Sequence, residues 1–160
     1  PPVMGMCRLL NLLLGMSALG SFTTPGNLYC ALLMGLYVTS VTFFARSESG
    51  ESSPWRLRLG FGGVLLAVAG LSGIPLLVRD PNPWWPAMAG VLLIRIVSPV
   101  WSALTTRAPV DVQGAVKAFV VAIILFDACL VMIPRGPAAA LAVLSLLVPT
   151  VLLGRRFRVT

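Results

Sequence analysis

A series of long apolar runs with almost no charge constrains the fold of this chain more than any other feature. A helix that crosses the hydrocarbon core of a bilayer needs about 20 mostly apolar residues. Runs of about this length occupy residues 3–22, 27–45, 59–78, 84–106, 113–133 and 137–153. They lack the alternating polarity of barrel strands, and only helices or closed barrels satisfy their own backbone hydrogen bonds in lipid. The sequence therefore predicts an all-α, polytopic transmembrane helix bundle of about six spanning helices, forming a single domain over residues 1–160.

Composition supports a lipid bilayer as the partner of these runs. Of the 160 residues, 58% are hydrophobic and only 11% are charged, whereas about a quarter of a typical soluble domain is charged. A soluble protein of this size has too little core to bury so much apolar surface. The net charge of +7 does not indicate nucleic acid, because the basic residues stand singly between apolar runs instead of clustering on one face.

The basic residues fall unequally on the two sides of the predicted membrane. One side carries seven of them: Arg46, Arg56, Arg58, Arg107, Arg155, Arg156 and Arg158. The other side carries only Arg79 and Arg135. Short cytoplasmic loops are enriched in Lys and Arg. We therefore expect residues 46–58 and the C-terminus to be cytoplasmic, in an inner or plasma membrane.

Small residues and prolines within the runs predict where helices approach one another or bend. Gly63, Ala67 and Gly70 share one helical face, and a face of small residues allows close packing of membrane helices. Three prolines inside apolar runs predict kinks; they are Pro75, Pro99 and Pro149.

Polar side chains near the predicted cytoplasmic ends suggest a binding pocket. Arg8 and Asn11 lie three residues apart on one helical face, Arg46 ends the second run, and Lys117 lies early in the fifth. Ionisable groups within membrane helices indicate function by default. Together these four side chains predict a cationic pocket for an anionic head group, of which a diphosphate is the natural candidate. The alternative, strongest for Lys117, is that the side chain extends to the interface without a partner.

Arg95 and Asp127 lie deeper, in two runs that are adjacent in sequence and antiparallel. Charges inside membranes are usually tolerated as pairs. We expect an ion pair between these two residues, as a structural latch or as part of an inner site, and the latch is the favoured interpretation.

Glu48 and Glu51 are the acidic residues of the stretch "FFARSESGESSPWR". Mg²⁺ binds one or two carboxylates together with substrate phosphates, so this pair is a candidate metal site. A hydrated turn rich in Ser and Gly has the same composition, and on the residues alone the turn is favoured.

Three stretches resemble the C-terminal half of the UbiA superfamily of membrane prenyltransferases, with most similarity to a divergent, EboC-type branch. They are "MCRLLNLLLGMSALG", "GNLYCALLMGLYVTSVTFFARSESGES" and "VDVQGAVKAFVVAIILFDACLV", and the resemblance covers nearly the whole chain. The resemblance implies an all-helical bundle, usually of nine helices. It also implies transfer of a prenyl group from a prenyl diphosphate to a lipophilic acceptor, with Mg²⁺ bound by two aspartate-rich motifs.

The resemblance also implies roles for individual residues. The first aspartate-rich motif would precede Pro1, in an N-terminal half of the same bundle that is missing here. The second would fall at residues 45–51, where Glu48 and Glu51 replace the aspartates. Arg8, Asn11, Arg46 and Lys117 carry over as diphosphate or head-group contacts.

The four runs that follow residues 45–51 exceed the family's usual three helices, which implies an added C-terminal helix or an error in the division of the runs.

Two alternatives to catalysis remain open at this point. One is a non-catalytic UbiA-like protein that binds or moves an isoprenoid or other lipid. The other is half of a transporter, for which discontinuous helices or a repeat would be expected. Neither feature is clear in the sequence.

Overall fold

The computed structural model describes residues 1–17, 24–46, 54–78 and 80–156, and the side chains of these residues as far as residue 152. Helices account for almost all of this part of the chain, and no strand occurs within it. The predicted all-α helix bundle is therefore confirmed.

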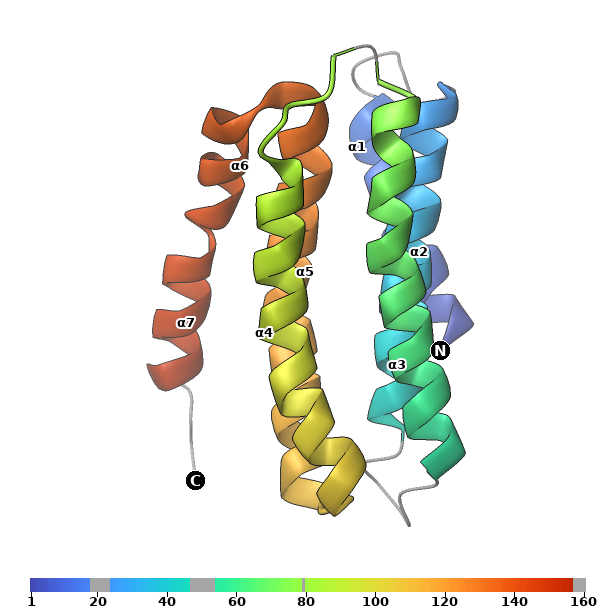
Figure 1. Ribbon diagram of the computed structural model, residues 1–160, viewed down its shortest axis with the longest axis vertical. Helices are drawn as coiled ribbons and strands as arrows, with labels where there is room; N and C mark the ends of the chain where they lie inside the picture. The colour runs from blue at the N-terminus through green and yellow to red at the C-terminus, as the bar shows by residue number, and fades with distance from the viewer. Residues whose placement is uncertain (18–23, 47–53, 79, 157–160) are drawn as a thin grey trace.

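The helices run alternately up and down the long axis of the molecule (Figure 1). Their bounds are α1 (Pro2–Ser17), α2 (Pro25–Ala45), α3 (Pro54–Gly70), the 3₁₀ helix η1 (Leu71–Leu76), α4 (Trp85–Thr106), α5 (Pro109–Arg135), α6 (Pro137–Leu144) and α7 (Leu147–Arg156). Five of these begin at a proline, which suits the first helical position because its fixed φ is already helical and its missing N–H has no helical partner there.

Four of the described helical segments are long and apolar enough to cross a membrane, where the sequence predicted about six. They are Pro25–Ala45, Pro54–Leu76, Trp85–Thr106 and Pro109–Arg135. The first predicted span is represented by α1, which has 16 residues and a length of about 24 Å; residues 18–22 of that span lie outside the described residues. The chain is thus a membrane protein with four described helices of spanning length.

The last predicted span, residues 137–153, is divided into α6 and α7 by a turn at Ser145 and Leu146. Pro149 explains the position of the break. A proline has no N–H to donate to the carbonyl four residues earlier, and its ring clashes with that carbonyl. The carbonyl concerned belongs to Ser145, which accepts a 3.1 Å hydrogen bond from the N–H of Val148 instead. The predicted kink is therefore a tight turn between two α-helices.

Pro75 has a milder effect on the third span. The α-helical part ends at Gly70, and the remainder continues as the 3₁₀ helix η1, which contains Pro75. The hydroxyl of Tyr29 on α2 donates a 2.9 Å hydrogen bond to the carbonyl oxygen of Gly70, at the junction of the two helix types. By contrast, α4 stays helical through Pro99.

Aromatic side chains join α2 to α5 in the core. Tyr37 is fully buried, and its hydroxyl donates a 2.9 Å hydrogen bond to the carbonyl oxygen of Phe119. The ring of Tyr37 lies 4.9 Å from that of Phe126, and the rings of Phe44 and Phe119 meet edge to face at 5.1 Å. A buried hydroxyl with a partner is stable in an apolar interior.

The predicted small-residue face on α3 packs against α2. A Cβ atom added to Gly63 would collide with Ser40, one added to Gly70 would collide with Leu33, and Ala67 is fully buried. The same ridge begins one turn earlier at Gly60 and continues into η1 at Gly73. The prediction of close helix approach at this face is confirmed.

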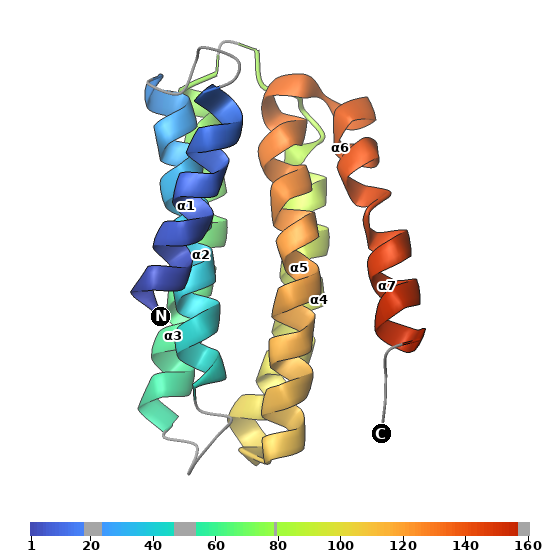
Figure 2. The same cartoon turned by 180° about the vertical axis from the view of Figure 1, so that it is seen from behind.

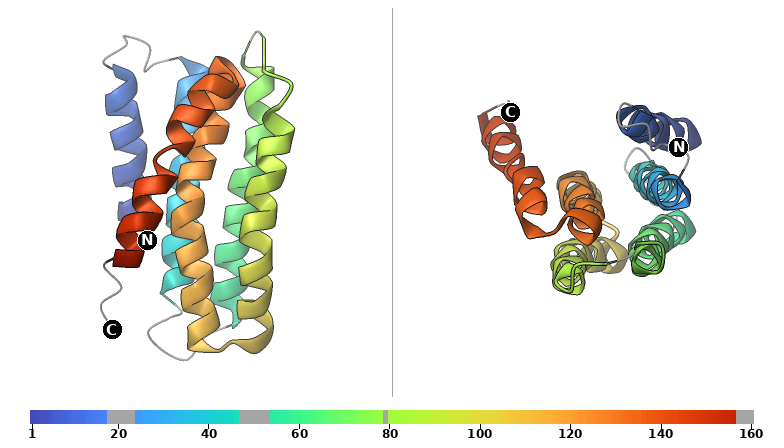
Figure 3. Two further views of the ribbon diagram at one scale, coloured as in Figure 1. Left: turned by 90° about the vertical axis from the view of Figure 1, so that its left-hand side faces the viewer. Right: turned by 90° about the horizontal axis from the view of Figure 1, so that it is seen from above.

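The helices lie along a curve when the molecule is seen from above, with α1 to α3 on one arm and α4 to α7 on the other (Figure 3). Seen from behind, α1 and α5 both face the viewer (Figure 2). Because α1 packs mainly on α2, any contact between α1 and α5 joins the two arms.

Candidate functional site

One end of the bundle carries four of the eight basic residues whose side chains the structure describes. Arg46 caps the end of α2, Arg56 and Arg58 lie in the first two turns of α3, and Arg107 caps the end of α4. All four are exposed. The end of α2, the start of α3 and the connection between α4 and α5 lie at the same end of the bundle (Figure 1), so these arginines form one group, the basic end.

An aromatic contact fixes the two helix ends that flank residues 47–53. The rings of Phe43 on α2 and Trp55 on α3 meet edge to face, with centroids 5.9 Å apart. Glu48 and Glu51, the candidate Mg²⁺ ligands, lie outside the described residues.

The described carboxylates do not fit a Mg²⁺ site. In the part of the chain that the structure covers, no group of three His, Cys, Asp or Glu side chains is placed to hold a metal. Asp111 accepts a hydrogen bond from the hydroxyl of Thr106, and Asp127 is bound to Arg8. A Mg²⁺ site would therefore depend on Glu48 and Glu51, and no chemical step through the metal follows from the described residues.

An ion pair between Arg8 and Asp127 joins the two arms of the bundle. The Nη2 of Arg8 donates a hydrogen bond to the Oδ2 of Asp127 at 2.8 Å, and the side chains are 35% and 22% exposed. The Nε of Arg8 is buried and has no hydrogen-bond partner among the described residues. The pair links α1 to α5 across 119 positions of sequence.

The predicted pairing of Asp127 with Arg95 is wrong. Helical geometry gives the reason. At about 100° per residue, Asp127 lies about 80° around α5 from Lys117, and it contacts α1. Arg95 is exposed on α4 and lines a groove that it shares with Lys117. The two charges occupy neighbouring helices but different faces.

Arg8 also lies deeper than expected. Gly5, one turn before it, packs against Gly35 and Thr39, near the middle of α2. Arg46 lies eleven residues beyond Gly35, which is about 16 Å along the helix axis. Arg8 is therefore a mid-depth residue, not part of the mouth of the bundle.

The four predicted head-group contacts occupy different places. Arg8 is paired with Asp127, and Asn11 is exposed on α1. Arg46 belongs to the basic end. Lys117 lies ten residues before Asp127 on α5, about 15 Å away along the axis.

A groove between α4 and α5 has two charged residues, Arg95 and Lys117, in its walls. Its volume is about 640 Å³. The lining residues are Ile94, Arg95, Ser98, Pro99, Ser102, Gly114, Lys117, Ala118 and Val121. Sequence reasoning missed this site because it assigned Arg95 to Asp127. The signal that would have found it is the spacing of Arg95, Ser98 and Ser102, which places a polar stripe on one side of an apolar helix.

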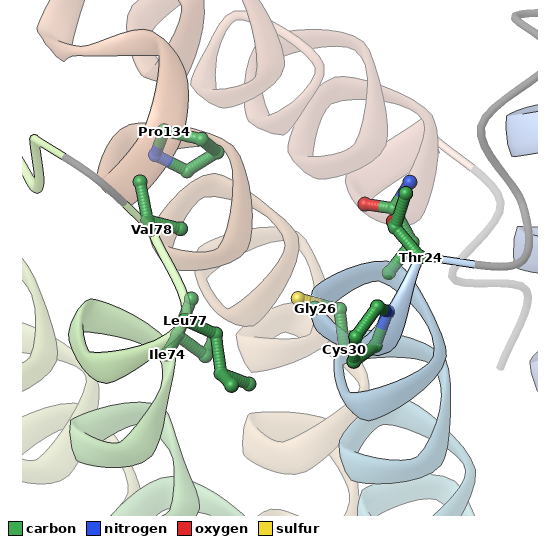
Figure 4. A pocket seen from close by; sticks show the side chains of 9 residues that line it. Thr24, Gly26, Cys30, Ile74, Leu77, Val78 and Pro134 are labelled. Atoms are coloured by element: carbon green, nitrogen blue, oxygen red, sulfur yellow. The ribbon is translucent and has the colours of Figure 1, made fainter.

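A second cavity, of about 210 Å³, lies at the end of the bundle opposite the basic end, where α2 begins and where η1 and α5 end. Figure 4 shows Cys30, Ile74, Val78 and Pro134 among the side chains around it. Its walls are mostly apolar and include no charged residue.

Comparisons of the chain with protein-family models, with curated proteins and with solved structures give no significant match.

Proposed function

We propose that this chain is a UbiA-like integral membrane protein that uses a prenyl diphosphate and transfers its prenyl group to a lipophilic acceptor. The basic end is the observation that supports this most directly. Arg56 and Arg58 lie near the start of α3, which follows the segment that contains Glu48 and Glu51. Arginine forms charge-assisted, often bidentate hydrogen bonds with phosphate oxygens, so this end suits a diphosphate whose prenyl chain lies along the apolar helices.

In this proposal the arginines of the basic end bind and orient the diphosphate. Their charge would also stabilise the negative charge that the diphosphate gains as its bond to the prenyl carbon breaks. The acceptor would then attack the allylic carbon. The described residues assign no part of this reaction to a metal.

A second candidate is that the protein binds or moves an isoprenoid or other lipid without transferring a prenyl group. The α4–α5 groove favours it, because Arg95 and Lys117 offer positive charge to an anionic lipid without any metal. Binding without product formation would distinguish this candidate from the first.

The test is a prenyl-transfer assay on the full-length protein in liposomes, with Mg²⁺ or EDTA, several chain lengths of prenyl diphosphate and several acceptors. We expect product with the unmodified protein. The double substitution Arg56→Gln and Arg58→Gln should weaken prenyl diphosphate binding at least tenfold, because each lost hydrogen bond to a charged group costs about 1.5–3 kcal/mol.

Arg135→Gln, at the opposite end of α5, is the matched control and should leave binding unchanged. Binding without product under any condition would refute transfer and favour the second candidate. Unchanged binding in the Arg56/Arg58 variant would exclude the basic end as the diphosphate site.

The proposal includes an orientation in which residues 46–58 and the C-terminus are cytoplasmic. In a background with Cys7, Cys30 and Cys129 replaced by alanine, we expect Asp80→Cys to react with an impermeant maleimide in intact cells. Arg56→Cys should react only after permeabilisation. Both positions are exposed: Asp80 lies in the connection between η1 and α4, and Arg56 lies in the first turn of α3, at the opposite end of the bundle. The reverse labelling pattern would therefore contradict the orientation.

A further inference from the structure

Arg95 and Lys117 are two cations that line the α4–α5 groove, within the apolar length of their helices. Neither forms a hydrogen bond or an ion pair within the part of the chain that the structure covers. None of the described carboxylates forms an ion pair with either cation. Asp111 accepts a hydrogen bond from Thr106, Asp127 binds Arg8, and Asp80 lies in the connection after η1. A charge that stays unpaired inside a membrane is costly and usually indicates a substrate or ion site.

Arg95 lies far from both ends of its helix, and therefore far from the membrane surface. The helix α4 has 22 residues, and Arg95 is the eleventh. At 1.5 Å per residue the helix is about 33 Å long, close to the hydrocarbon thickness of about 30 Å. Arg95 therefore lies about 15 Å from either end, near the middle of the bilayer.

Lys117 lies at a similar depth on the antiparallel helix. The connection between α4 and α5 contains only Arg107 and Ala108. Lys117 is nine residues after Ala108 and Ser98 is nine residues before Arg107, so the two lie level, about one turn from Arg95. Both cations thus belong to one region of the groove.

The two serines of the groove behave differently from the other described hydroxyl residues of the helices. Ser17, Ser40, Thr42, Ser72 and Ser145 each donate a hydrogen bond to the backbone carbonyl oxygen three or four residues earlier. Ser98 and Ser102 donate none within the described residues, and both line the groove. Two hydroxyl donors and two cations therefore face one space.

The rest of the lining is apolar. It consists of Ile94, Pro99, Ala118 and Val121, together with Gly114, beside which a Cβ would meet no atom within 4 Å. The volume of about 640 Å³ lies in the range of about 300–1,000 Å³ that is typical of ligand sites. Such walls match a ligand with an anionic group and a hydrocarbon chain.

We propose that the α4–α5 groove is a binding site for the phosphate group of a single-chain amphiphile. Arg95 and Lys117 neutralise the phosphate, Ser98 and Ser102 donate hydrogen bonds to it, and the hydrocarbon chain lies against Ile94 and Val121. A phospholipid of the surrounding bilayer keeps its phosphate at the membrane surface, so the ligand is one that enters between the helices. This site uses none of the residues of the basic end and stands independently of prenyl transfer.

The test measures binding of dodecyl phosphate to the purified full chain in a neutral detergent, with dodecanol and inorganic phosphate as comparison ligands. We expect dodecyl phosphate to bind at least tenfold more tightly than dodecanol. Arg95→Gln and Lys117→Gln should each weaken binding about tenfold or more, because hydrogen bonds to charged groups are stronger than neutral ones. Arg95→Lys with Lys117→Arg keeps both charges and should bind within a few-fold of the unmodified chain.

Two controls separate this proposal from misfolding and from the proposed function. Arg135→Gln should bind dodecyl phosphate normally. Measured in the Arg56→Gln/Arg58→Gln background, which lacks two arginines of the basic end, dodecyl phosphate binding should still depend on Arg95 and Lys117, whatever that variant does in prenyl transfer. Inorganic phosphate that binds as tightly as dodecyl phosphate, with the same dependence on Arg95, would support the anion site and identify a free anion as its ligand. Equal affinity for dodecanol, or unchanged binding in the Arg95/Lys117 double variant, would overturn the proposal.

Discussion

Replacement of Asp127 by leucine is expected to destabilise the folded bundle by about 2 kcal/mol. Breaking a buried ion pair by removing one partner costs about 3–5 kcal/mol, because the remaining charge is left without compensation. The Arg8–Asp127 pair is partly exposed, at 35% and 22%, so solvent reduces that cost. The measurement is the free energy of unfolding in mixed micelles with increasing denaturing detergent.

A double-mutant cycle decides whether the pair itself is responsible. Removal of both charges, in Arg8→Leu with Asp127→Leu, should cost about 1–2 kcal/mol less than the sum of the single substitutions, since residues in contact couple by about 0.5–3 kcal/mol. Arg95→Leu combined with Asp127→Leu is the matched control. For that pair, the loss of unfolding free energy in the double variant should equal the sum of the two single losses to within about 0.5 kcal/mol. Coupling of Asp127 to Arg95 instead of Arg8 would refute the observed pairing.

The fold class was predictable from the sequence because the length and hydropathy of a run are set by the bilayer. The four segments that contain α2, α3, α4 and α5 agree with that rule. It fails for the last predicted span, since mean hydropathy does not register that Pro149 cannot donate to the carbonyl of Ser145, where the α-helix is interrupted. The first predicted span is only partly covered by α1.

The candidate sites were less predictable, because the sequence does not show which neighbour a side chain faces, and for Arg8 the predicted depth was also wrong. Arg95 and Asp127 were expected to pair since their helices are adjacent. The fold instead brings α1 onto the side of α5 that carries Asp127, so the partner is Arg8. Contact between α1 and α5 depends on the curvature of the whole bundle, which no local pattern specifies. This same rearrangement leaves Arg95 to the groove with Lys117.

Substitution of Gly60 by leucine is expected to separate α2 from α3. A Cβ at this position would lie 2.8 Å from the Cβ of Phe44 and 3.0 Å from its backbone nitrogen and Cα, so backbone and not only side chain must move. Overpacking in a tight interface typically costs about 1–3 kcal/mol. We expect a loss near the upper end of that range, and a smaller loss for Gly60→Ala.

Gly62 provides the matched control for this substitution, since it lies two residues away on the same helix and is exposed. A Cβ there meets no atom within 4 Å. Leucine should raise the helix propensity of both positions by a similar amount, up to about 1 kcal/mol. Gly62→Leu should therefore be neutral or slightly stabilising, and the difference between the two variants measures the packing of α2 on α3. Equal unfolding free energies would show that α2 and α3 do not approach at Gly60, and would contradict the ridge of small residues as the contact surface between these helices.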